Sequence, residues 1–134
     1  MNPPRSETLP LRSDEDLVRV RQAVRAWMVE QNFNLVEQTK MVTAASELGR
    51  NALVYGGGGS ARLESPVDGG HGGIRVTFED HGPGIADIAQ ALSNGFSTGG
   101  GLGLGLGGAK RLVKDFEIFS EPGQGTRVII TIRK

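Results

Sequence analysis

Two stretches in the first half of the chain show the three-and-four spacing of apolar residues that is typical of amphipathic helices. The first helix is expected to begin where Ser13 and Asp16 resemble a capping box, with Asp in place of Glu, and to end near Glu30. Its apolar positions are Leu17, Val20, Val24, Trp27 and Met28. The second helix should run from about Leu35 to Tyr55, where four consecutive glycines stop it. Its apolar side is expected to hold Val36, Thr39, Val42, Ala45 or Ser46, Leu48 and Ala52.

The alternation of apolar and polar residues that is typical of strands is clearest in residues 74–80, IRVTFED. Residues 60–65 also alternate, and a hairpin over residues 61–80 is the simplest interpretation of the two segments. The remaining expected elements are a first strand from Thr8 to Arg12, short helices over 86–92 and 104–114, and a final hairpin over 116–134 that turns at Glu121 to Gly125. Pro10 would restrict the first strand to a sheet edge or a strand start.

The expected order of elements is therefore β-α-α-β-β-α-α-β-β. Strands in adjacent pairs favour a mixed or mostly antiparallel sheet over the parallel sheet of repeated βαβ units. With the helices on one face of that sheet, the pattern predicts an α/β two-layer sandwich. We expect residues 1–7 to form a flexible N-terminal tail and residues 8–134 to form a single domain.

Composition removes several classes of function. Lys plus Arg and Asp plus Glu both number 15 in 134 residues, so the net charge is zero and does not indicate a nucleic-acid or membrane-surface partner. The chain has no cysteine, and its two histidines lack a metal-ligand pattern. No apolar run approaches the roughly 20 residues that span a bilayer, and the first residues lack the apolar core of a signal peptide. We therefore expect a cytoplasmic protein.

Glycine is the compositional anomaly, because all 21 glycines lie from Gly49 onward and most are clustered. One cluster follows a carboxylate at a strand end: Asp80, then Gly82, Pro83 and Gly84. Such a carboxylate could accept a hydrogen bond from an amino group such as adenine N6, while the glycines let a flat ring lie against the backbone. An ordinary glycine turn with an Asx-type hydrogen bond is the alternative.

The longest cluster is GFSTGGGLGLGLGGAKRL, residues 95–112. Backbone N–H groups in a glycine-rich loop before a helix can bind phosphates, and Lys110 and Arg111 follow in that helix. The alternative is a flexible loop, although the interleaved leucines are unlike a linker. Gly103-x-Gly105-x-x-Gly108 matches the dinucleotide fingerprint only formally, because no strand directly precedes it, and Lys110 lacks the Ser or Thr of a Walker A loop.

Two smaller features complete the candidate chemistry. Glu47 and Asn51 are four residues apart on the second helix and project from one face. Glu can act as a general base and an Asn amide oxygen can bind Mg²⁺, although the pair alone is also typical of a solvated helix face. The turn GQGT places Thr126 at the start of the last strand, which by itself is an ordinary hairpin.

Taken in order, these segments resemble the GHKL, or Bergerat-fold, ATP-binding superfamily. ELGRNA resembles its N box, and DHGPGI, GGGLGLGL and GQGT resemble its three glycine boxes, so the likeness extends from about residue 10 to the end of the chain. SELGRNALVY, EDHGPGI and the long glycine segment are most similar to the small anti-sigma-factor serine/threonine kinases, in particular the switch kinases of bacterial general-stress modules. The resemblance implies the same two-layer α/β fold.

The resemblance also implies roles for individual residues. Glu47 would be the general base, with Arg50 assisting at the phosphate end, and Asn51 would bind both the nucleotide and Mg²⁺. Asp80 would bind the adenine amino group, partly through water shared with Thr126, in a pocket shaped by Gly82, Gly84 and Ile85. The terminal phosphates would be held by a set of residues from the second glycine box and the following helix: Gly99, Gly100, Gly101, Leu102, Gly103, Leu104, Gly105, Leu106 and Lys110.

These roles imply an ATP- or ADP-binding enzyme that phosphorylates Ser or Thr on a STAS-domain anti-sigma antagonist or scaffold protein, in stress-response signalling. A PP2C-type phosphatase or a sigma factor would be a further partner. The alternative is a non-catalytic switch that sequesters or activates a regulatory protein, with nucleotide as a structural ligand. A nucleotide-binding fragment of a larger ATPase is a third interpretation.

Overall fold

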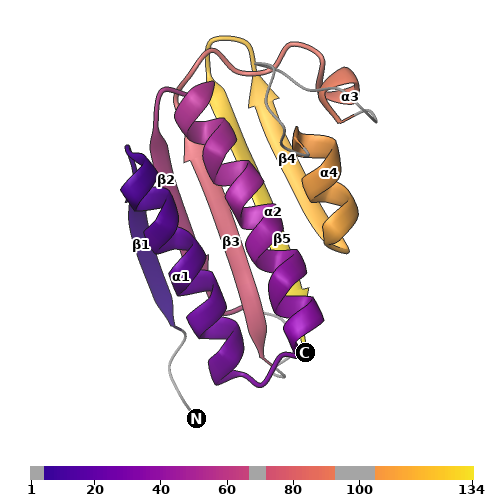
Figure 1. Ribbon diagram of the computed structural model, residues 1–134. Helices are drawn as coiled ribbons and strands as arrows, with labels where there is room; N and C mark the ends of the chain where they lie inside the picture. The colour runs from indigo at the N-terminus through magenta and orange to yellow at the C-terminus, as the bar shows by residue number, and fades with distance from the viewer. Residues whose placement is uncertain (1–4, 67–71, 93–104) are drawn as a thin grey trace.

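The computed structural model describes residues 5–66, 72–92 and 105–134, and its architecture is the predicted α/β two-layer sandwich (Figure 1). The helices are α1 (Asp14–Glu30), α2 (Leu35–Val54), α3 (Ile88–Ala91) and α4 (Gly105–Leu112). The strands are β1 (Ser6–Leu11), β2 (Gly59–Glu64), β3 (Gly73–Asp80), β4 (Asp115–Glu121) and β5 (Gly125–Arg133). The order of elements is the one that the sequence predicts.

The described strands form one sheet in the order β1-β2-β3-β5-β4, and each neighbouring pair is antiparallel. The sequence predicted a mixed or mostly antiparallel sheet, and the sheet of the described strands is antiparallel throughout. β1 begins at Ser6, where Ser6 and Glu7 pair with Glu64 and Leu63. Two residues that the sequence assigned to a flexible tail therefore belong to β1. This strand lies at the edge of the sheet, which is one of the two positions that Pro10 predicted for it.

Both long helices begin at side-chain caps. Ser13 Oγ accepts a hydrogen bond from the Asp16 N–H at 3.2 Å, whereas the Asp16 carboxylate accepts from the Arg12 N–H at 2.9 Å instead of closing a strict capping box. Asn34 and Glu37 form a complete capping box at the start of α2. The caps satisfy N–H groups that have no partner within the helix, so they fix where α1 and α2 start.

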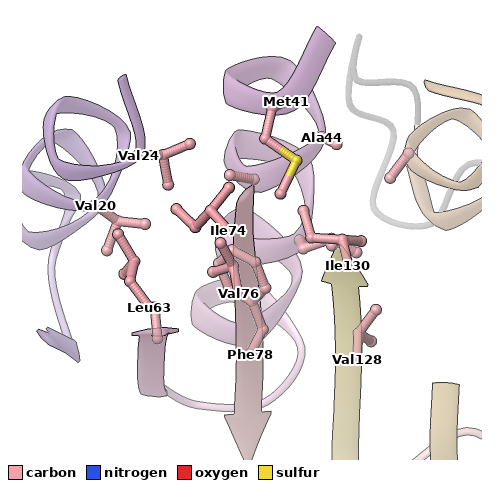
Figure 2. Packing of buried hydrophobic residues seen from close by; sticks show 14 of the residues in the cluster. Val20, Val24, Met41, Ala44, Leu63, Ile74, Val76, Phe78, Val128 and Ile130 are labelled. Atoms are coloured by element: carbon pink, nitrogen blue, oxygen red, sulfur yellow. The ribbon is translucent and has the colours of Figure 1, made fainter. Parts of the chain in front are cut away.

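The core lies between the sheet and the helices, which cover one of its faces (Figure 1). Figure 2 shows side chains of α1 and α2 directed toward those of β2, β3 and β5. Labelled there are Val20 and Val24 from α1, Met41 and Ala44 from α2, Leu63 from β2, Ile74, Val76 and Phe78 from β3, and Val128 and Ile130 from β5. The predicted apolar positions of α1 are all buried.

The predicted apolar side of α2 was partly wrong. Its buried residues are Met41, Ala44, Ala45, Leu48, Gly49 and Ala52. Val36 is instead 62% exposed, and Thr39 is also exposed. The predicted apolar side began at Val36, whereas the buried side of α2 begins at Met41. Over the first two helical turns the predicted apolar side therefore faces away from the sheet. The stripes agree from Ala45 onward, which is the part of α2 nearest the candidate site.

The free energy of unfolding should depend strongly on Ile130, which is fully buried in β5 opposite Val76. We expect Ile130→Ala to lower it by about 2–5 kcal/mol, because the truncation removes buried methyl groups and leaves a cavity. Ile129→Ala is the matched control, since Ile129 is the next residue on the opposite face and is only half-buried. Urea titrations of both variants test this, and equal losses would contradict the assignment of the two faces.

Candidate functional site

A row of three polar side chains crosses one end of the sheet on the face that the helices cover. The strand register pairs Asp80 of β3 with Thr126 of β5, and Thr126 with Ser120 of β4. Side chains alternate between the faces of a strand, so these residues share the face of Phe78 and Val128, two positions along. Cross-strand neighbours lie about 5 Å apart at Cβ. The register therefore places three oxygen-bearing side chains beside an apolar floor.

A cavity of about 390 Å³ lies between this row and the helices. Its wall from α2 is formed by Leu48, Asn51, Ala52 and Tyr55, whose spacing of three and four puts them on one side of the helix. The residues of the sheet that line it are Phe78, Asp80, Thr126 and Val128. The remaining lining residues are Gly56, Pro83, Gly84, Ile85, Ala86, Asp87, Ala91, Gly105 and Leu106. A mainly apolar cavity with a few polar groups among its lining residues is the usual form of a small-ligand site.

The Asp80 carboxylate is held by the backbone around it. Its Oδ1 accepts a hydrogen bond from the Gly82 N–H at 3.0 Å, so the Asx-type turn considered as an alternative does occur. A Cβ on Gly56 would lie 2.3 Å from Asp80 Cγ, and a Cβ on Gly82 would lie 2.6 Å from the Gly56 Cα. The backbone after α2 thus packs directly against the carboxylate. The turn and a ligand-binding role are compatible, because Oδ1 alone receives the turn's hydrogen bond.

The loop after β3 is fastened to the turn between β4 and β5. The Gly123 N–H donates to the Pro83 carbonyl at 2.7 Å, and the Ile85 N–H donates to Ser120 Oγ at 2.7 Å. Gly84 has a φ of +77°, and a Cβ there would lie 2.1 Å from the Glu121 carbonyl oxygen. Glycine is required at this position for both reasons. The turn of the third box therefore holds in place the loop of the first box, whose Gly84 lines the cavity.

Ser120 is the residue of this wall that sequence reasoning missed. Its hydroxyl also lies 3.0 Å from the Gly125 carbonyl oxygen and 2.8 Å from Thr126 Oγ1. The sequence does carry a sign of it, because the turn at 121–125 makes residue 120 the cross-strand neighbour of residue 126. Ser120 lies outside the motif GQGT, and only the hairpin register places it beside Thr126.

The other predicted site residues divide into three groups. Asn51, Asp80, Gly84, Ile85, Gly105, Leu106 and Thr126 line the cavity. The second group does not line the cavity: Gly82 packs against Gly56 next to Asp80, and Glu47 is half-buried one helical turn before Asn51. Arg50 on α2 and Lys110 on α4 are exposed and also belong to this group. The third group lies outside the described residues: Gly99, Gly100, Gly101, Leu102, Gly103 and Leu104.

The described parts of the chain carry neither a metal-binding cluster of acidic, His or Cys side chains nor a membrane-spanning helix. No group of three or more His, Cys, Asp or Glu side chains is arranged to hold a metal ion there. None of the helices in residues 5–66, 72–92 and 105–134 has the length and apolar character needed to cross a membrane. A metal at the cavity would thus rely on an amide oxygen and on the ligand's own oxygens.

The chain is similar to known proteins over most of its length. The family model for histidine kinase-, DNA gyrase B- and HSP90-like ATPases matches residues 36–134. The chain is 44% identical over 113 residues to the serine/threonine-protein kinase RsbT of Bacillus subtilis (strain 168), covering 84% of this chain and 85% of that protein. It is 32% identical to the anti-sigma F factor of Heyndrickxia coagulans, covering 90% of this chain and 84% of that protein.

A solved structure supports the fold. The crystal structure of the RsbU and RsbW domains of a Mycobacterium tuberculosis protein matches with a TM-score of 0.65 and 24% identity. The match covers 98% of this chain and 32% of that longer one. At this identity the likeness concerns the arrangement of helices and strands alone.

Proposed function

The chain belongs to the family of histidine kinase-, DNA gyrase B- and HSP90-like ATPases, and we propose that it is a partner-switching protein kinase. In this proposal it transfers the terminal phosphate of ATP to a Ser or Thr hydroxyl of a STAS-domain anti-sigma antagonist or scaffold protein. The chain is homologous to a serine/threonine kinase and to anti-sigma factors over most of its length. Its substrates and its sigma factor are cytoplasmic in this scheme, so we assign it to the cytoplasm.

The single observation that carries the proposal is the oxygen row at the end of an apolar cavity. A purine ring would lie between the sheet residues Phe78 and Val128 and the loop residue Ile85, all of which line the cavity. The exocyclic amino group of adenine would donate to the Asp80 carboxylate, which the Gly82 N–H already orients. The close packing of Gly56 against Asp80 keeps that carboxylate from turning away from the cavity.

The phosphate end would lie toward the start of α4. The helix begins at Gly105, and Gly105 and Leu106 line the cavity, so N–H groups at a helix N-terminus are available near the ligand. Lys110 is exposed on the same helix and would approach the terminal phosphate. By resemblance, residues 99–104 would complete the phosphate loop.

The donor set suits magnesium. Asn51 lines the cavity and has no hydrogen bond from its side chain within the described residues, so its amide oxygen is available as a ligand. Mg²⁺ is usually held by one or two protein oxygens together with phosphates and waters, which fits a site that has no carboxylate cluster among the residues described. Bound there, Mg²⁺ would neutralise charge on the phosphates during transfer.

Glu47 would act on the incoming hydroxyl. It lies one helical turn before Asn51 and remains partly open to solvent, so a partner's side chain can reach it. Its carboxylate would accept the hydroxyl proton while the hydroxyl oxygen bonds to the γ-phosphorus and the bond to the β,γ-bridging oxygen breaks, which releases ADP. The exposed Arg50 would stabilise negative charge on the phosphoryl group during its transfer.

A second role is supported by the similarity to an anti-sigma F factor over most of the chain. In that role the protein would bind and sequester a sigma factor, or activate a PP2C-type phosphatase, with nucleotide as a structural ligand. Binding and catalysis need not exclude each other, because a partner must dock beside Glu47 before it is phosphorylated.

Two measurements on the full chain test the proposal. Calorimetry should show one site for Mg-ADP with a Kd that rises when Mg²⁺ is removed. Incubation with γ-labelled ATP and purified STAS-domain proteins should then label the partner, whereas a tight complex without label would favour the binding role. Absence of any adenine-nucleotide binding by folded protein would overturn both roles.

A further inference from the structure

The hydroxyl of Ser120 contacts three other groups in the wall beside the cavity. It receives the Ile85 N–H at 2.7 Å, lies 3.0 Å from the Gly125 carbonyl oxygen and lies 2.8 Å from Thr126 Oγ1. Ser120 itself does not line the cavity, whereas Ile85 and Thr126 both do. The serine therefore stands directly behind two residues that face the ligand.

Counting protons fixes the direction of these hydrogen bonds. A serine hydroxyl has one hydrogen to donate and can accept from two donors. The Gly125 carbonyl can only accept and the Ile85 amide can only donate, so the Ser120 hydrogen goes to Gly125. Thr126 must then be the donor in the remaining contact with Ser120. Its own hydrogen is thereby directed away from the cavity, and the oxygen that faces the ligand can only accept.

Asp80 stands next to Thr126 in the same row and is also an acceptor. We propose that Ser120 is a specificity-determining positioning residue: by accepting the Thr126 proton, it leaves Asp80 and Thr126 as two neighbouring acceptors on the sheet side of the cavity. Such a pair of acceptors suits a purine with a 6-amino group, which donates directly or through a water, and disfavours a purine with a 6-oxo group. The inference rests on the proposed nucleotide-binding function and adds the origin of its base selectivity.

The matched pair of probes is ADP and inosine 5′-diphosphate, which differ in the base edge at positions 6 and 1 and share the ribose and phosphates. We expect the wild-type protein to bind Mg-ADP more tightly than Mg-IDP, by at least about tenfold, which is the worth of roughly one hydrogen bond. In Ser120→Ala, Thr126 is free to rotate and donate its proton to the 6-oxo group. The ratio of the two Kd values should then fall by about tenfold, through weaker ADP binding, tighter IDP binding or both.

Further variants separate positioning from a structural effect. Ser120→Thr keeps the hydroxyl on a β-branched residue that suits a strand, and it should retain most of the wild-type ratio. Thr126→Val removes the acceptor directly and should lower the ratio as Ser120→Ala does. Adding Ser120→Ala to Thr126→Val should lower it no further, because the serine acts through the threonine.

The outcomes are distinct. If Ser120→Ala weakens both nucleotides by the same factor, the serine merely supports the wall and the inference is wrong. The same holds if the wild-type protein binds IDP as tightly as ADP, a result that does not depend on how any variant folds. Failure to bind either nucleotide would instead overturn the proposed function, and this inference with it.

Discussion

Replacement of Glu47 by Gln is expected to reduce the rate of phosphate transfer to a partner by about 100- to 10,000-fold, the usual contribution of a general base. The amide has nearly the shape of the carboxylate but cannot take up the hydroxyl proton. Glu47 does not line the nucleotide cavity, so the Kd for Mg-ADP should stay within about twofold of the wild-type value. Single-turnover transfer from labelled ATP measures the rate, and calorimetry measures the Kd.

Glu117→Gln is the matched control for this prediction. Glu117 is an exposed carboxylate on β4, opposite Ile129 on the sheet face away from the helices, and it lines neither the cavity nor the wall behind it. Its variant should transfer phosphate at the wild-type rate. Transfer by Glu47→Gln within threefold of wild type would show that the proton goes elsewhere, while nucleotide binding could still hold.

The layered fold could be predicted because its local patterns are strong. Ile74, Val76 and Phe78 alternate without interruption, and the final hairpin turns at glycines, so the β2–β3 and β4–β5 pairs follow from strands that are neighbours in sequence. The β3–β5 pair in the middle of the sheet joins strands that are not neighbours in sequence, and no local pattern predicts it. The buried side of α2 was harder to predict. Leu35 and Val36 are apolar but are 70% and 62% exposed. A prediction from hydrophobicity alone therefore gave the wrong buried side for the first two turns of α2.

The residues of the candidate site that lie in sequence motifs could be predicted, whereas the contacts that depend on the tertiary structure could not. Asp80, Thr126 and Asn51 lie in recognisable boxes, and the structure brings them to one cavity. The contact between Gly56 and Asp80 joins the end of α2 to the end of β3, and no local pattern indicates that approach. Ser120 likewise follows only from the cross-strand register.

The second large effect is expected at Asp80, where Asp80→Asn should weaken Mg-ADP binding by about 100-fold, or roughly 3 kcal/mol. The side chain has two contacts to serve, the Gly82 N–H and the adenine amino group, and both are donors. Asn offers one acceptor oxygen and one NH₂ group. Whichever way the amide is turned, a donor faces a donor at one of the two contacts, and the charge-assisted hydrogen bond is lost.

Glu79→Gln provides the control, because Glu79 precedes Asp80 in β3 and points to the opposite face of the sheet, opposite Arg127. It removes the same charge from the same strand end without reaching the cavity of Asn51 and Thr126. Calorimetry should therefore give a Kd near the wild-type value for Glu79→Gln, and Mg-ADP should raise its melting temperature as in the wild type. Binding of Mg-ADP by Asp80→Asn within threefold of wild type would mean that the purine is not held by the Asp80 carboxylate, which is the acidic member of the row with Thr126 and Ser120.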